Sequence, residues 1–149
     1  MSEEIIESAG EADTLALGER LGRSASPGDI YLLDGDLGVG KTVFAKGFAR
    51  GLDIKDTIVS PTFTIVHEYD GRLRLFHFDV YRIGDPDEMY DIGFDEYLYG
   101  DGVCLIEWPE RVAELIPDTA VRISIEKDNE RGFDYRRIRI AAAGGERHI

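Results

Sequence analysis

The sequence feature that most constrains this chain is a glycine-rich run that fits the pattern G-x-x-x-x-G-K-[ST] in full. The run reads Gly35-Asp36-Leu37-Gly38-Val39-Gly40-Lys41-Thr42. An apolar run at residues 30–33 precedes it, and a helical pattern at residues 43–51 follows it. A buried strand that passes through such a loop into a helix is the context in which this pattern binds phosphates. A glycine-rich turn with a surface lysine is the weaker interpretation, because chance gives the full pattern in well under about one chain in a hundred.

Each residue type in this loop has a task in binding a nucleoside triphosphate. Glycines adopt backbone dihedrals that other residues avoid, and they allow N–H groups to approach the phosphates closely. The positive end of the following helix strengthens this attraction, and its first turn includes the N–H of Val43. We expect Lys41 to bind the β- and γ-phosphates of ATP, and Thr42 to ligate Mg²⁺ through its hydroxyl.

Two carboxylates follow apolar runs and are candidates for magnesium binding and for activating water. Glu107 follows residues 103–106, the more completely apolar run and therefore the better central parallel strand. We assign Glu107 to the metal, and Asp79, which follows residues 75–78, to orienting or activating the attacking water. The structural alternative for Asp79 is a strand-end ion pair with Arg82.

Other residues have both a functional and a structural interpretation. Thr62 is a candidate sensor of the γ-phosphate, and the alternative is an ordinary turn or strand residue. Trp108, the only tryptophan, marks a partner surface or packs at the edge of the core. His77 alternates with two phenylalanines and so faces away from them, which favours a hydrogen-bonded structural histidine over a phosphate contact. The arginine cluster Arg131, Arg136, Arg137 and Arg139 either contacts the nucleotide or a partner or lies on a solvated strand face, which is the favoured interpretation.

Composition restricts the class of protein. The length of 149 residues predicts one domain, 1–149, with a loose tail at about residues 141–149. The net charge of −13 repels phosphate backbones, so we do not expect this chain alone to hold a nucleic acid tightly. The acidic N-terminus lacks the pattern of a signal peptide, and no apolar run approaches a membrane span of about 20 residues. We therefore expect a cytoplasmic protein with no membrane association.

Periodicity predicts the remaining elements. Helical spacing covers residues 12–21, and Asp70-Gly71 between two β-rich segments predicts a hairpin of strands 58–69 and 72–81. A helical segment is expected from residue 85, and a short helix at 109–116. Two final strands are expected at 121–125 and 135–140. The prediction is a single-domain α/β P-loop NTPase fold. Its mixed sheet has parallel core strands extended by antiparallel strands, and helices cover both faces.

Four blocks of sequence, at these separations, resemble the bacterial TsaE (YjeE) family over nearly the whole chain. They are the phosphate loop followed by Ser60-Pro61-Thr62-Phe63, Phe78-Asp79-Val80-Tyr81-Arg82 and Glu107-Trp108-Pro109-Glu110. The resemblance implies a small ATPase that uses ATP and Mg²⁺ and is needed to make threonylcarbamoyladenosine in tRNA. It implies binding to a complex of TsaB and TsaD, no transfer of the threonylcarbamoyl group by this chain, and contact with tRNA only through that complex.

The resemblance also implies roles for individual residues. It supports Lys41 and Thr42 at the phosphates and magnesium, Glu107 at the metal, and Asp79 and Trp108 as functionally sensitive positions. It further implies that the segment around Glu11 to Thr14 lies near the adenine and that Arg131 closes over the nucleotide.

Two other functions fit a phosphate loop of this kind. A small-molecule kinase needs an acceptor pocket and usually an arginine-bearing lid, and the chain shows no insertion for such a lid. A nucleotide-sensing protein without meaningful hydrolysis needs only the binding loop. Phosphate transfer to a defined acceptor favours the first alternative, and intact ATP after incubation with every partner favours the second.

Overall fold

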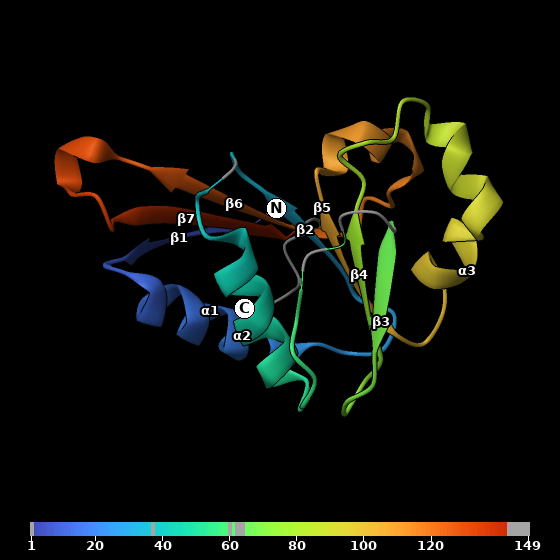
Figure 1. The fold of residues 1–149 in the computed structure, drawn as a ribbon, viewed down its shortest axis with the longest axis horizontal. Coiled ribbons are helices and arrows are strands. Elements are labelled where there is room, and N and C mark those ends of the chain that lie inside the picture. Colours follow the sequence, from blue (N-terminus) through green and yellow to red (C-terminus); the bar gives the residue numbers. More distant parts are fainter. Residues whose placement is uncertain (1, 37, 60, 62–64, 143–149) are drawn as a thin grey trace.

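A seven-stranded mixed sheet forms the centre of the computed structural model, which describes residues 2–36, 38–59, 61 and 65–142 (Figure 1). The order across the sheet is β1-β7-β6-β2-β5-β4-β3. The strands are β1 (Ser2–Ser8), β2 (Ile30–Asp34), β3 (Val66–Tyr69), β4 (Leu75–Asp79), β5 (Val103–Glu107), β6 (Val121–Lys127) and β7 (Arg136–Ala142).

The direction of the strands divides the sheet into a core and two extensions. The strands β6, β2, β5 and β4, adjacent in this order, are parallel to one another. Antiparallel pairing adds β7 and β1 beyond β6, and β3 beyond β4. The expected α/β fold, with a parallel core that antiparallel strands extend, is confirmed.

Helices cover both faces of the parallel core. One face holds α1 (Glu11–Ser24) and α2 (Lys41–Gly51), and the other holds η1 (Pro86–Ile92), α3 (Phe94–Leu98) and η2 (Pro109–Leu115) (Figure 1). A 3₁₀ turn, η3 (Asn129–Arg131), lies between β6 and β7. Every residue of β5 is buried because this strand has covered faces and two paired neighbours. No helix among the described residues is long and apolar enough to span a membrane.

Close contact between α1 and α2 sets the position of the helix that follows the phosphate loop. A Cβ at Gly47 would overlap the carbonyl oxygen of Leu15, and a Cβ at Gly51 would overlap that of Glu19. Gly18 gives the same close approach from α1, where a Cβ would overlap the carbonyl oxygen of Phe44. Residue 15 of α1 lies against residue 47 of α2, and residue 19 lies against residue 51. Residue numbers therefore increase in the same direction along both helices, and the first turns of the two helices lie at the same level.

The structure corrects several predicted elements in the first half of the chain. The strand β1 was not predicted, because two adjacent isoleucines between glutamates do not alternate as a half-buried strand does, and its pairing with β7 joins opposite ends of the chain. The hairpin is confirmed, but β3 and β4 are shorter than the predicted 58–69 and 72–81, and the loop between them spans residues 70–74. The two strands are antiparallel to each other, as predicted, and β4 in addition joins the parallel core beside β5.

Further corrections concern the second half of the chain. The predicted helical segment from residue 85 divides at Gly93, which has a φ of 73°, into a 3₁₀ helix and a short α-helix. The predicted helix at 109–116 is a 3₁₀ helix with non-helical backbone at Val112. The predicted loose tail is wrong for Ala141 and Ala142, which are the last residues of β7, and residues 143–149 lie outside the described residues.

Candidate functional site

The phosphate loop joins the end of β2 to the start of α2, and its glycines have the backbone that the loop requires. Gly38 has a φ of 80° and Gly40 a φ of 103°, in the left-handed region that favours glycine. A Cβ at Gly35 would lie 2.8 Å from the carbonyl oxygen of Ile125 and 2.9 Å from Cγ2 of Val39. The glycines are therefore required by backbone conformation at two positions and by close packing at a third.

The N-terminus of α2 is a favourable place for an anion. Gly40 caps the helix without a side-chain hydrogen bond, and the first turn contains no acidic residue. The first intrahelical bond joins the N–H of Phe44 to the carbonyl of Gly40, at 3.0 Å. The N–H groups before Phe44 have no carbonyl acceptor within the helix, and together with the helix dipole they attract a phosphate.

Lys41 begins α2 with its ammonium group turned inward. The residue is 6% exposed, and its Nζ forms no hydrogen bond with any described residue. The Nζ lies 3.9 Å from the centre of the Trp108 ring, so a cation–π contact is the interaction seen for this charge. A buried ammonium without a hydrogen-bond acceptor is costly, and the phosphate oxygens of a nucleotide are acceptors that would compensate it.

The two candidate carboxylates lie side by side at the edge of the sheet that carries the loop. The strands β2, β4 and β5 are parallel, so their carboxyl ends meet at one edge. Asp79 is paired in register with Glu107. Burial raises the pKa of the Asp79 carboxyl, the hydrogen bond that it accepts from the N–H of Tyr81 lowers it, and the charge of Glu107 raises it further. His77 and Lys41 are also close enough to lower this pKa by their charges.

His77 connects the buried ends of β4 and β5. Its side chain is fully buried, and its Nε2 lies 2.6 Å from Oε2 of Glu107, which is itself 4% exposed. The flanking Phe78 belongs to the apolar cluster on the opposite face of the sheet, as the alternation of the sequence predicted. The expectation of a hydrogen-bonded histidine is confirmed, and its partner is the carboxylate assigned to magnesium.

Trp108 extends the site from Lys41 to the protein surface. Its backbone is left-handed, with a φ of 61°, which is uncommon for a bulky residue and often accompanies a functional constraint. The ring of Tyr81 lies 4.7 Å from the indole, and the guanidinium of Arg111 lies 5.3 Å from the Tyr81 ring. Trp108 therefore packs at the edge of the core and contacts Lys41, and its predicted role in marking a partner surface stays a prediction.

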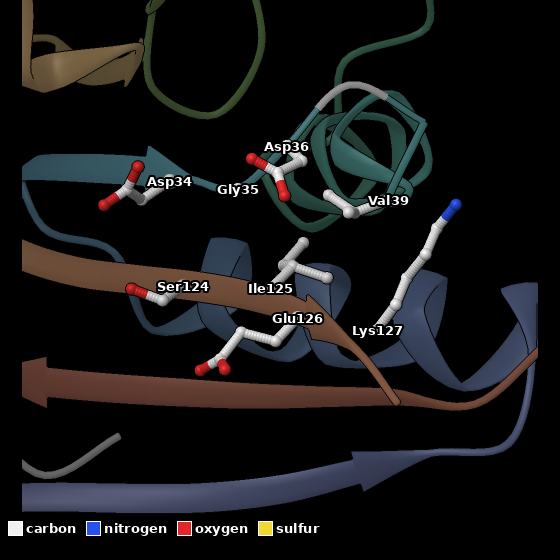
Figure 2. Close-up of a pocket in the computed structure, with 8 residues that line it drawn as sticks. All are labelled: Asp34, Gly35, Asp36, Val39, Ser124, Ile125, Glu126 and Lys127. Carbon is white, nitrogen blue, oxygen red and sulfur yellow. The ribbon is translucent and has the colours of Figure 1, made fainter. Parts of the chain in front are cut away.

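A pocket of about 600 Å³ adjoins the start of the loop. Figure 2 shows Asp34, Gly35 and Asp36 beside the loop, with Ser124, Glu126 and Lys127 from the facing strand β6. Ion pairs join Asp34 to Arg122 at 3.5 Å and Glu126 to Arg139 at 2.9 Å. Three carboxylates in the lining disfavour a triphosphate in this pocket, whereas the N-terminus of α2 and Lys41 are more favourable for an anion.

Arg136 is a residue of the site that sequence reasoning placed on a solvated strand face. Its Nε donates a hydrogen bond of 2.8 Å to the carbonyl of Val39, in the middle of the loop. Its Nη1 donates to the carbonyls of Phe133 and Tyr135, at 2.9 and 2.7 Å. Arg136 thus ties the phosphate loop to β7, a contact between residues 97 positions apart in sequence.

The remaining predicted residues are less closely tied to the loop. Glu11 begins α1 and is exposed, at the level of the first turn of α2. Arg131 forms an ion pair of 2.9 Å with Glu7 and lies over the Tyr135 ring, so its charge is engaged away from the loop. Leu37 and Thr62 lie outside the described residues, and their predicted roles stay predictions.

The donor set is suited to magnesium that a nucleotide helps to hold. Among the described residues, no group of three or more histidine, cysteine, aspartate or glutamate side chains is arranged to bind a metal ion alone. Mg²⁺ typically takes one or two protein oxygens together with substrate phosphates and water. Thr42 in the first turn of α2 and Glu107 at the end of β5 carry oxygens of the kind that could bind such an ion.

The raised pKa of Asp79 leads to a prediction on stability. A carboxyl whose folded-state pKa exceeds its unfolded value of 3.8 binds its proton more tightly when folded. The protein therefore loses stability as the pH rises through the window between these two values. Asp79→Asn keeps an oxygen that accepts from Tyr81 but removes the charge, so we expect a small rise in Tm at neutral pH, about 2 °C or less.

Thermal unfolding followed by circular dichroism at several pH values checks this expectation. The gain in Tm should shrink as the pH falls through this window and vanish well below 3.8, where the wild-type carboxyl is protonated in both states. An Asp79→Asn variant with a lower Tm than the wild type at neutral pH would contradict the assignment of burial as the dominant influence.

Comparisons with known proteins agree on one family. The family described as "Threonylcarbamoyl adenosine biosynthesis protein TsaE" matches residues 8–138. A relative from Bacillus subtilis, described as "tRNA threonylcarbamoyladenosine biosynthesis protein TsaE", is 47% identical over 89% of this chain and 81% of its own length. A relative of the same description from Treponema pallidum is 49% identical over 76% of this chain and 84% of its own length.

A solved structure has the same fold. The crystal structure of YdiB from Bacillus subtilis superposes with a TM-score of 0.80 and 40% sequence identity. The match covers 96% of this chain and 87% of that chain.

Proposed function

This chain belongs to the TsaE family of threonylcarbamoyl adenosine biosynthesis proteins, and on that basis we propose that it is a slow Mg²⁺-dependent ATPase serving a TsaB–TsaD complex. In this proposal it supports the formation of threonylcarbamoyladenosine in tRNA without transferring the threonylcarbamoyl group. The observation that carries the ATPase is the buried ammonium of Lys41, at the N-terminus of α2 and next to the carboxylate pair of Asp79 and Glu107.

The residues of the site divide the work of phosphoryl transfer. The N–H groups at the start of α2 and the Lys41 ammonium bind the phosphates. Thr42 and Glu107 would hold the magnesium ion, which neutralises charge on the phosphates when it is bound. The Asp79 carboxylate orients the attacking water and accepts its proton, and a pKa raised by burial makes this carboxylate a stronger base.

Slow hydrolysis by the chain alone is consistent with the positions of the described arginines. Arg131 is paired with Glu7, and Arg136 donates its hydrogen bonds to backbone carbonyls. Phosphoryl transfer commonly needs a further cation in the transition state, and a partner protein often supplies it. The TsaB–TsaD complex is the partner that we propose, and tRNA is reached only through it because a net charge of −13 repels RNA.

The test measures ATP hydrolysis with Mg²⁺, by the chain alone and with TsaB and TsaD. We expect a low rate that rises with the partners and falls at least about tenfold in Glu107→Ala, because the metal loses a ligand. Glu110→Ala is the matched control, since Glu110 is an exposed acid near the same strand end. ATP that binds but stays intact in every mixture would leave a nucleotide-sensing module, and transfer to an added acceptor would indicate a kinase.

A further inference from the structure

His77 is a buried histidine that the proposed chemistry does not use. It lies on β4 two residues before Asp79, on the face of the sheet that α2 covers. On this face Leu75 precedes it on β4 and Leu105 is its register partner on β5, while His67 is its register partner on β3 and forms no hydrogen bond with it. A fully buried imidazole in such surroundings needs a polar partner, and the one that it has is Glu107.

The direction of this hydrogen bond follows from the chemistry of the two groups. An ionised carboxylate only accepts hydrogen bonds, so Nε2 of His77 carries the proton and donates it to Oε2 of Glu107. The Nδ1 atom has no hydrogen-bond partner among the described residues. The ring thus directs the donor at Nε2 to Glu107.

This bond restrains a side chain that would otherwise have freedom. Glutamate reaches its carboxylate through three rotatable bonds, and fixing such a side chain costs conformational entropy. The bond to Oε2 holds one oxygen against β4 and leaves the lone pairs of Oε1 for a metal ion or its bound water. Partners of this kind orient metal ligands in proteins, and their loss typically lowers metal affinity by about 10–100-fold.

We propose that His77 is a positioning residue, which holds the Glu107 carboxylate in the orientation that binds the magnesium ion of Mg·ATP. The inference rests on the proposed Mg²⁺-dependent ATP binding and adds to it a residue that acts on the metal through Glu107. A purely structural role for His77 makes a different prediction, because a packing defect would weaken nucleotide binding equally with and without magnesium.

The test compares two amides of different reach at position 77. In His77→Gln the amide nitrogen stands close to the place of Nε2, so the donor to Glu107 is kept. In His77→Asn the same amide is one bond shorter and does not reach Oε2. Calorimetric titration with a non-hydrolysable ATP analogue, in excess Mg²⁺ and in EDTA, gives the factor by which magnesium raises affinity. Thermal unfolding identifies the variants that remain folded.

We expect His77→Asn to reduce the factor by which magnesium raises affinity for the ATP analogue about tenfold or more, while the affinity in EDTA stays unchanged. His77→Gln should keep this factor within about threefold of the wild-type value. In a Glu107→Gln background, His77→Asn should have no further effect on the factor. An unchanged factor in folded His77→Asn, or an equal loss of affinity with and without magnesium, overturns the inference. A wild-type chain whose affinity does not respond to magnesium would instead overturn the proposed function.

Discussion

Lys41→Ala is expected to weaken ATP binding by roughly 100-fold, which corresponds to about 2.7 kcal/mol. The ammonium is buried, forms no hydrogen bond with any described residue, and stands at the N-terminus of α2. Hydrogen bonds between a charged donor and phosphate contribute about 1.5–3 kcal/mol each. The variant loses these bonds and also the positive charge that attracts the nucleotide.

Lys46→Ala is the matched control, because Lys46 lies on the same helix with an exposed side chain. We expect this variant to bind ATP with nearly the affinity of the wild type. Calorimetric titration of each chain with a non-hydrolysable ATP analogue and Mg²⁺ makes the comparison. A Lys41→Ala chain with wild-type affinity would show that the glycine loop is a structural turn and would remove ATP from the proposed function.

The second large effect concerns the contact between α1 and α2. Gly47→Ala is expected to lower the free energy of unfolding by about 3 kcal/mol. The new methyl group would overlap the carbonyl oxygen of Leu15 and would lie 3.1 Å from the N–H nitrogen of Glu19. Both atoms belong to the backbone, so no side-chain rotation relieves the overlap and the helices must separate. The greater helix propensity of alanine offsets only about 1 kcal/mol of this cost.

Gly10→Ala is the control for the general effect of adding a methyl group. Gly10 has extended backbone, with a φ of 176°, and a Cβ there would meet nothing within 4 Å. Urea and thermal unfolding should show Gly10→Ala within about 0.5 kcal/mol of the wild type. Gly47→Ala should lower Tm by on the order of 10 °C. Equal stability of Gly47→Ala and the wild type would contradict the close approach of the two helices.

Local sequence predicted those parts of the site that depend on neighbouring residues. The phosphate loop was predicted because its glycines, Lys41 and Thr42 lie within eight consecutive positions, and the strand and helix around it are confirmed. The apolar runs that end in Asp79 and Glu107 were predicted for the same reason, since a strand and its last residue are adjacent in the chain. The roles assigned to these side chains stay predictions.

Edge strands and strand direction were harder to predict. The sequence of β1 shows no alternation of polar and apolar residues, and the strand forms only because β7, more than 120 residues later, offers its hydrogen-bonding groups. The parallel direction of β4 depends on β5, which lies beside it only after the chain has passed through η1 and α3. Periodicity reports which residues share a face of an element, and it does not report which element comes next in the sheet.

The sequence by itself determined that this chain has a phosphate loop at the end of a buried strand, with carboxylates at the ends of two others. Tertiary structure decided which distant residues support them. It placed His77 against Glu107, Trp108 against Lys41 and Arg136 against the carbonyl of Val39. The physical reason is the range of the interactions. Backbone conformation and burial pattern are local properties, whereas a hydrogen bond between residues 30 or 97 positions apart exists only when the sheet has brought their strands together.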